Sequence, residues 1–162
     1  MVSSEKNQLV KAIAPVLEMD GFKRKAATWH RVGGVFIQTL NVQGSQWSKS
    51  FHLNLGVYIR ALGGRLDPPI FECHVRNRVE SLLEDASNYH RLLDFENDIP
   101  QDMRFREIVG VIGTHAIPWL EEYSDTGRIA AAIAVPTRQG LLVSPDVYDL
   151  LGVAMPQRGN RQ

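Results

Sequence analysis

Residues 50–60 read Ser-Phe-His-Leu-Asn-Leu-Gly-Val-Tyr-Ile-Arg, and this stretch decides the fold class. Large apolar residues stand at every second position from Phe51 to Ile59, with mostly polar residues between them. Such alternation is typical of a strand that has one buried face and one polar face. The stretch therefore predicts a long strand in a sheet whose two faces differ in character, as they commonly do in antiparallel sheets.

Two strand-like runs precede this stretch at short spacing, residues 28–32 and 35–43. Gly33-Gly34 between them is typical of a hairpin turn. A fourth strand is expected from Ile70 to about Arg76, with Phe71, Cys73 and Val75 toward the core. Because the connections among the first three runs are too short for parallel crossovers, the runs predict an antiparallel meander of about four strands.

The rest of the chain is predicted to be mainly helical. Apolar residues at helical spacing predict a helix over residues 4–19, in which Pro15 should either make a kink or mark where a second short turn begins. Further helices are expected at 79–86, 101–123, 125–133 and 144–151, and Pro118 should break or kink the longest. The sequence thus predicts one α+β domain, residues 1–155, with an N-terminal helix and a C-terminal helical part packed on the sheet. Residues 156–162 are expected to be a flexible tail.

The composition predicts an ordinary globular protein of the cytoplasm. Of 162 residues, 44% are hydrophobic and 22% are charged. Cys73 is the single cysteine, so an internal disulfide is impossible and a reducing compartment is suitable. The polar start has no signal-peptide character. The longest apolar run, Ile129 to Val135, is too short to cross a bilayer.

The formal net charge is zero, but the charges are segregated along the chain. Residues 21–66 hold seven bases and no acid, whereas residues 67–125 hold thirteen acids and five bases. Segregated charge favours an anionic partner at the basic part. The alternative is that the basic segment folds against the acidic one and each screens the other.

The polar side of the predicted sheet is the best candidate for a functional surface. Arginine suits carboxylate and phosphate groups, and histidine titrates near neutral pH. Such a face suits the binding of an anion, although it can equally be a solvated or helix-covered face with routine polar residues. By alternation the face presents His52, Asn54 and Tyr58 from the third strand, His74, Arg76 and Arg78 from the fourth, and Asn41 with Thr39 or Gln38 from the second.

Other motifs predict little chemistry. Cys73 and His74 are adjacent on a strand, so they point to opposite faces and do not form a metal site. No catalytic, metal or cofactor motif is recognised in the sequence. Trp47 is either a binding aromatic in its loop or, more commonly, a lid folded on its own core. The run Lys23-Arg24-Lys25 is either a weak nucleic-acid patch or a solvated turn.

Several segments follow one another in a distinctive order. They are Gly21-Phe22-Lys23-Arg24-Lys25, Thr28-Trp29-His30-Arg31, Asn41-Val42-Gln43 with Ser45, residues 51–58 and Cys73-His74-Val75-Arg76-Asn77-Arg78. Together these segments resemble a bacterial domain-of-unknown-function family, DUF4304. The resemblance covers roughly residues 5–125 and implies a small intracellular domain with an antiparallel sheet and helices, with no established activity. Within the matching segments, the residues without an obvious packing role are Asn41, Gln43, Asn54, His74, Arg76 and Arg78.

Three hypotheses for function follow. The first is a non-catalytic binding module that holds an acidic protein or small anion on a basic sheet face. The second is an enzyme acting on a phosphate or carboxylate substrate, with His74 as acid/base and Arg76 and Arg78 as the anion clamp. The third is nucleic-acid binding, against which the zero net charge counts. The sequence favours the first and identifies no partner or oligomeric state.

Overall fold

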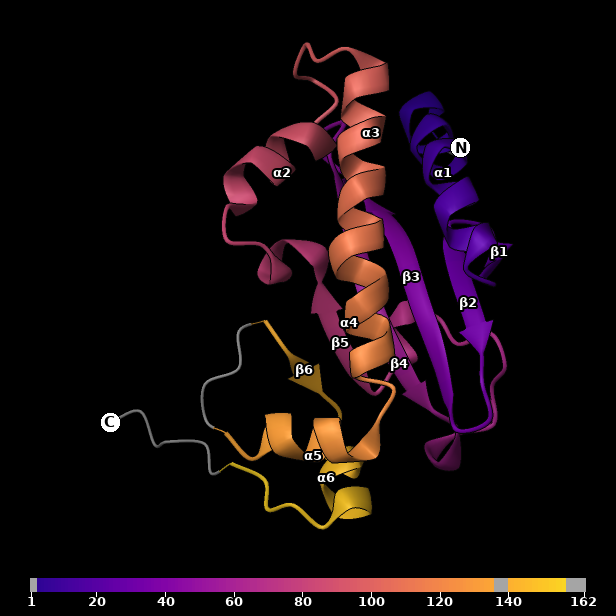
Figure 1. Ribbon diagram of the computed structural model, residues 1–162, viewed down its shortest axis with the longest axis vertical. Helices are drawn as coiled ribbons and strands as arrows, with labels where there is room; N and C mark the ends of the chain where they lie inside the picture. The colour runs from indigo at the N-terminus through magenta and orange to yellow at the C-terminus, as the bar shows by residue number, and fades with distance from the viewer. Residues whose placement is uncertain (1–2, 136–139, 157–162) are drawn as a thin grey trace.

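A computed structural model describes residues 3–135 and 140–156 of the chain. It has one six-stranded antiparallel sheet, and the strands lie side by side in their order along the chain (Figure 1). The predicted α+β fold and antiparallel meander are confirmed, but the sheet has six strands rather than about four. The strands are β1 (Lys23–Lys25), β2 (Thr28–Val32), β3 (Phe36–Gly44), β4 (Phe51–Ile59), β5 (Val75–Arg78) and β6 (Leu142–Val143).

The two additional strands lie at the edges of the sheet. β1 is three residues long and pairs with β2, and β6 is two residues long and pairs with β5; neither has a second partner strand among the described residues. Neither strand is long enough to show a period of two, so alternation in the sequence does not reveal them. Short edge strands, and lysines on β1, also limit pairing with other chains.

The helices cover one face of this sheet, with α1, α3 and α4 lying across it (Figure 1). The first helix occupies its predicted range and runs unbroken through Pro15. Its N-terminal cap is Ser3, which accepts a bond from the backbone N–H of Lys6, and Gly21 follows its end with a φ of 89°. The α-helices are α1 (Ser4–Met19), α2 (Ala86–Leu93), α3 (Gln101–Val111), α4 (Ile117–Glu122), α5 (Thr126–Ile133) and α6 (Pro145–Leu151).

Pro118 was predicted to break or kink the long helix, and the structure shows that it does not break it. Instead α3 continues into one π-helical turn, Ile112–Ala116, and then into α4. Proline lacks an N–H and its ring clashes with the carbonyl four residues earlier in an α-helix. The wider π turn relieves that clash, and within it the N–H of Ile117 bonds to the carbonyl of Ile112. Helical structure is therefore continuous from α3 through the π turn into α4.

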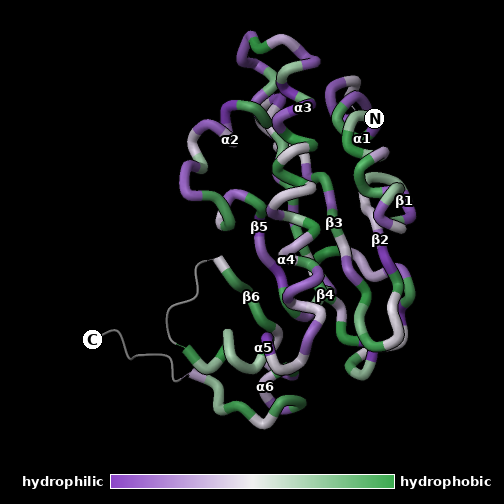
Figure 2. Tube along the Cα trace, viewed as in Figure 1, coloured by the Kyte–Doolittle hydropathy of each residue, from purple (hydrophilic) through white to green (hydrophobic). Residues whose placement is uncertain are grey.

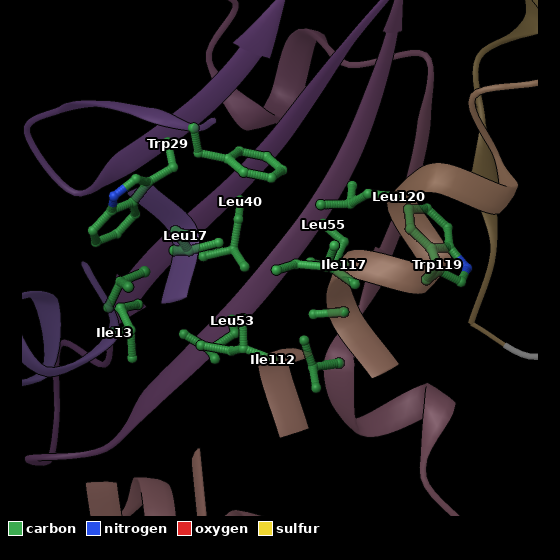
Figure 3. Close-up of a cluster of buried hydrophobic side chains, with 14 of the residues drawn as sticks. Ile13, Leu17, Trp29, Leu40, Leu53, Leu55, Ile112, Ile117, Trp119 and Leu120 are labelled. Carbon is green, nitrogen blue, oxygen red and sulfur yellow. The ribbon is translucent and has the colours of Figure 1, made fainter. Parts of the chain in front are cut away.

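One large hydrophobic core fills the space between the sheet and the helices. Side chains from the alternating apolar positions of β4 meet side chains from α1, α3 and α4, as Figure 3 shows for Leu55 and Ile117. Along α1 and α3, short stretches of hydrophobic residues alternate with short stretches of hydrophilic residues (Figure 2), as expected for helices with one buried side. Trp29 of β2 is completely buried at one side of this core.

The fourth predicted strand is displaced. Ile70–Glu72 is a 3-10 turn, η2, and β5 begins only at Val75. Val75 faces the core as predicted, but Phe71 is 69% exposed. Cys73 packs with Ile37 and Tyr58 on the opposite side of the sheet. The prediction that Phe71 and Cys73 join the main core is therefore wrong, because the segment 70–73 is not an extended strand.

The face of the sheet turned away from the helices is hereafter the open face. The segment 60–74 crosses one half of it and connects β4 to β5. It includes two short 3-10 turns, η1 (Arg60–Leu62) and η2. His30 Nε2 lies 2.7 Å from the carbonyl oxygen of Pro68, and Lys25 forms an ion pair with Asp67. The uncovered half of the open face is the part that carries the candidate site.

The chain between β5 and α2 forms a further 3-10 turn, η3 (Val79–Leu82), where a helix over 79–86 was expected. Near the C-terminus, α5 is capped by Asp125, which accepts a bond from the backbone N–H of Arg128. The expected flexible tail, 156–162, lies outside the described residues except for Pro156. No helix among the described residues is long and apolar enough to span a membrane.

Candidate functional site

The register of β3, β4 and β5 brings several predicted site residues together on the open face. Asn41 of β3 lies opposite Asn54 of β4, which in turn lies opposite Arg78 of β5. Gln43 lies opposite His52, and Arg76 lies opposite Gly56. Residues directly opposite in an antiparallel pair have neighbouring side chains on the same face. The register also places Thr39 on the open face and Gln38 on the helix-covered face.

Amide side chains form a hydrogen-bonded chain across three strands. Asn54 Nδ2 donates to Asn41 Oδ1 at 3.3 Å and to Gln43 Oε1 at 2.9 Å. Asn41 Nδ2 in turn donates to Thr28 Oγ1 of β2 at 3.0 Å. Mutual hydrogen bonds restrict the rotamers of these side chains before any ligand arrives. Thr28 was not among the predicted site residues, although its position opposite Asn41 follows from the hairpin register.

A hollow of about 940 Å³ lies over this part of the sheet. Five of the eight predicted site residues line it: Asn41, Gln43, Asn54, Arg76 and Arg78. Its other walls come from η2, η3 and the segment that leads into β6. These additional lining residues are Leu55, Ile70, Phe71, Asn77, Glu80, Ser81, Gly140, Leu141 and Leu142.

The two arginines of the hollow differ in their surroundings. The Arg78 guanidinium lies 4.0 Å from the carboxylate of Glu80, at the outer limit of an ion pair. Arg76 is half-buried, and no residue in the described part of the chain forms a hydrogen bond or an ion pair with its guanidinium. A guanidinium presents five donors in a planar fork that matches a carboxylate or a phosphate. Arg76 is therefore free to bind an anion in the hollow.

His52 lies at the edge of this group beside an acidic residue. Its Nδ1 is 3.3 Å from Glu80 Oε1, the same oxygen that Arg78 approaches. The other oxygen of Glu80 is buried and has no hydrogen-bond partner among the described residues. Glu80 thus lies between a histidine and an arginine, and it offsets part of the positive charge of the hollow. Sequence reasoning missed Glu80 because it expected a helix to begin at Val79.

The remaining two predicted site residues, Tyr58 and His74, are buried away from the hollow. Tyr58 packs with Ile37 and Cys73 beneath the segment 60–74. The His74 ring lies 4.6 Å from the Tyr58 ring, centroid to centroid, and its Nδ1 accepts a 2.8 Å bond from the backbone N–H of Ile59. His74 is only 6% exposed. The expectation that both side chains stand on an open polar surface is therefore wrong. The segment 60–74 covers Tyr58, and His74, its last residue, is buried against the Tyr58 ring.

A family model for a domain of unknown function, DUF4304, matches residues 13–122, which is most of the chain. The chain belongs to the DUF4304 family. The matched range contains the whole sheet from β1 to β5 and every predicted site residue, and it ends before α5, β6 and α6. No curated protein and no solved structure matches the chain. The resemblance in segment order is thus confirmed, and family membership by itself assigns no activity.

The basic segment of this DUF4304 chain is screened in part. Four of the seven bases of segment 21–66 form ion pairs, and their acidic partners come from the N-terminal residues 1–20 and from the acidic segment 67–125. Arg31, for example, reaches both Asp20 and Glu121 from the end of β2. The screening alternative therefore describes much of segment 21–66. The pairs are Lys25–Asp67, Arg31–Asp20, Arg31–Glu121, Lys49–Glu5 and Arg65–Glu72.

Two other candidate features, Trp47 and Cys73, lie away from the hollow. Trp47 is 93% exposed at the tip of the β3–β4 hairpin, so it does not fold down as a lid on the core. Cys73 is buried, and burial raises the pKa of its thiol to about 11, which keeps it protonated and unreactive at neutral pH. The described residues contain no group of three or more side chains suited to hold a metal ion.

The buried ring of His74 makes stability depend on pH. Burial lowers the pKa of His74, although the charge of Asp146 partly opposes this effect. The unfolded chain therefore takes up a proton more readily than the folded chain does. The contribution of neutral His74 to the free energy of unfolding is complete above the pKa that His74 has in the unfolded chain, about 6.5. It is lost as the pH falls toward the lower pKa that His74 has in the folded protein. We expect the urea midpoint to fall more between pH 7.5 and 5.5 in the wild type than in His74→Asn.

The asparagine variant is a suitable control because its side-chain oxygen can accept the Ile59 N–H but does not titrate. Other titrating groups, such as the carboxylates, affect both proteins alike, so the difference between the two pH profiles isolates His74. Parallel profiles for the two proteins would show that protonation of His74 does not oppose folding.

Proposed function

We propose that this DUF4304 chain is a non-catalytic binding module that holds an acidic partner or a small anion in the hollow of the open face. The single observation that supports this most is Arg76, a half-buried guanidinium that lines the hollow and lacks an anionic partner among the described residues. Partly desolvated donors that remain unpaired are unfavourable, so a bound anion would stabilise this site.

The surroundings of Arg76 favour an anion in two further ways. The amide chain of Asn41, Gln43 and Asn54 is held by its own hydrogen bonds, so little side-chain freedom is lost when a ligand binds. Arg78 adds a second guanidinium on the same strand and the same face. Glu80 is the one acid among the described lining residues, and its Oε1 lies 3.3 Å from His52 Nδ1 and 4.0 Å from Arg78 Nη1.

The enzymatic alternative has less support. It requires His74 as the acid/base group, yet the Nδ1 of this ring is engaged by the Ile59 N–H and the side chain is buried. His52 has a carboxylate neighbour, Glu80, whose Oε1 Arg78 also approaches, but His52 does not itself line the hollow. The one hydroxyl group among the described lining residues is Ser81, and no hydrogen bond links it to a histidine among them, so binding alone is proposed.

Nucleic-acid binding also has less support. The basic run Lys23–Lys25 forms the exposed edge strand β1, but Lys25 is paired with Asp67. Affinity for nucleic acid depends mainly on the number of unpaired cations that contact phosphates. The partial screening of segment 21–66 reduces that number.

The proposal predicts that Arg76→Gln weakens anion binding without unfolding the protein. Inorganic phosphate and a short glutamate peptide, added at constant ionic strength, are expected to shift the backbone amide signals of residues 41, 54 and 76–78 in ¹H–¹⁵N spectra. Hydrogen bonds to charged groups contribute about 1.5–3 kcal/mol, so the substitution should weaken binding by about tenfold or more. The melting temperature should change little, because Arg76 has no described partner to lose.

Arg106→Gln is the matched control, since Arg106 is an exposed arginine of α3 on the helix layer. This variant should bind the same anions as the wild type does. The proposal is wrong if neither probe gives a saturable shift in the wild-type protein, or if Arg76→Gln and Arg106→Gln bind the probes equally well.

A further inference from the structure

The hollow that contains Arg76 has an apolar wall opposite its amide wall. Phe71 is 69% exposed and Leu142 is 58% exposed, and both line the hollow together with the half-buried Ile70. Large apolar side chains that stand exposed in a concave site beside charged groups are typical of ligand-binding positions. An inorganic anion would contact the arginines and leave the apolar side chains of this wall exposed to solvent.

The apolar wall is adjacent to Arg76 in the strand register. Leu142 of β6 lies directly opposite Arg76 of β5, so the two side chains are neighbours on the open face. On the other side of Arg76, its partner in β4 is Gly56, which has no side chain. The space above Gly56 is occupied by Ile70 and Cys73. An anion at Arg76 is therefore flanked by aliphatic groups from two different elements.

Phe71 is held in its exposed position by its neighbour. Ile70 packs against Gly56 and joins Ile37, Tyr58 and Cys73 in the small cluster beneath the segment 60–74. That packing fixes the 3-10 turn η2, Ile70–Glu72, and turns the following residue, Phe71, outward to the hollow. An aromatic side chain on an anchored turn offers a flat apolar surface that costs little entropy to use.

From these positions we infer that the ligand of the hollow is a small organic anion with an apolar body. Its carboxylate or phosphate group binds the Arg76 guanidinium, and its apolar body lies against Phe71 and Leu142. The volume of about 940 Å³ lies within the range of small-molecule sites and exceeds the need of a simple ion. This inference rests on the proposed function and names the class of ligand for the same site.

Matched pairs of probes test the inference. Phenyl phosphate is compared with inorganic phosphate, and phenylacetate with acetate, by titration of the full chain in ¹H–¹⁵N spectra at constant pH and ionic strength. Contact of one phenyl ring with the apolar wall should make each aromatic probe bind about tenfold tighter than its inorganic or methyl counterpart. The phosphate and carboxylate pairs show which anionic group the site prefers.

Two variants separate the contributions. Phe71→Ser should remove most of the phenyl preference and leave phosphate affinity unchanged, and its exposure makes loss of folding a small risk. Arg76→Gln should weaken all four probes. Trp47→Ser is the matched control, because Trp47 is an exposed aromatic that does not line the hollow. It should bind every probe as the wild type does.

The outcomes distinguish the inference from the proposed function. If inorganic phosphate and phenyl phosphate bind equally well and both depend on Arg76, the site binds anions but the apolar-body inference is overturned. The inference is overturned as well if the phenyl preference survives Phe71→Ser or is lost in Trp47→Ser. If no probe binds, and the glutamate peptide does not bind either, the proposed function itself fails.

Discussion

Replacement of Arg104 by methionine is expected to lower the melting temperature by about 10 °C. Arg104 of α3 is only 1% exposed and donates to three backbone carbonyls. Its Nη1 donates to Leu92 and, at 3.1 Å, to Asp94, and its Nη2 donates to Asn97 at 2.8 Å. Methionine has similar length but no donor, so it leaves these carbonyls without their partner.

The size of this effect follows from the burial of the bonds. Each buried polar group left without a partner costs about 1–3 kcal/mol, and some of these carbonyls regain water when the loop relaxes. A net loss of about 3 kcal/mol corresponds to roughly 10 °C for a domain of this length. The loss of the guanidinium contact with the Phe95 ring, now 4.4 Å from its centroid, acts in the same direction.

Arg106→Met is the control for Arg104, two residues along the same helix. Arg106 is exposed, so its replacement should change stability by less than about 0.5 kcal/mol. Hydrogen exchange adds a local measurement, because the Phe95 N–H bonds to the Lys49 carbonyl and should exchange faster once the loop is released. Equal melting temperatures for the two variants would show that the carbonyl bonds of Arg104 do not stabilise the fold.

Arg104 also shows what periodicity does not reveal about a helix. Apolar residues at helical spacing over 101–123 predict a helix with Met103 on its buried side. In the structure Met103 is exposed and the neighbouring Arg104 is buried. A pattern based on apolar residues assigns arginine to the surface by default. The partners of Arg104 are carbonyls at the end of α2 and in the connection between α2 and α3, and their position depends on tertiary structure that spacing does not encode.

The sheet was predictable where strands are long and alternate. β4 differs from its predicted range by one residue at each end, and β2 matches its predicted range. The same rule failed just before β5, where apolar Phe71 and Cys73 alternate with polar Glu72 and His74. Pro68-Pro69 just before that segment, together with the packing of Ile70 above Gly56, sets a 3-10 turn there. Alternation over four residues does not distinguish such a turn from a strand.

The candidate site was predictable to the extent that it follows from strand register. Asn41, Asn54 and Arg78 lie on the open face because they occupy alternate positions of paired strands. His74 and Tyr58 share that alternation but are covered by the segment 60–74, whose path over the sheet is a tertiary feature. The separation of basic and acidic segments was visible in the sequence, but their contact in the folded protein was not. The ion pair of Arg31 with Glu121 shows that folding brings an acid of one segment beside a base of the other.

Gly56→Ala is expected to destabilise the protein by about 1–3 kcal/mol and to lower its melting temperature by roughly 5 °C. A Cβ atom at this position would lie 2.7 Å from both Cβ and Sγ of Cys73 and 2.9 Å from Cδ1 of Ile70. These distances are shorter than atomic contacts allow, so the turn η2 must move away from the sheet. Glycine weakens a strand in the absence of such contacts, and alanine would then be stabilising. A loss of stability in Gly56→Ala would therefore show that η2 packs closely on Gly56, whereas a gain would show that it does not.

Gly110→Ala provides the opposite case in the same protein. Gly110 lies within α3, and a Cβ there would meet nothing within 4 Å, so alanine should stabilise by about 0.5–1 kcal/mol. Because Ile70 anchors the turn that carries Phe71, Gly56→Ala should also reduce the preference for phenyl phosphate over inorganic phosphate, while Gly110→Ala should not. Stabilisation by both alanines, measured by urea unfolding, would mean that segment 70–73 does not rest on Gly56 and that Phe71 is not held at the hollow by this packing.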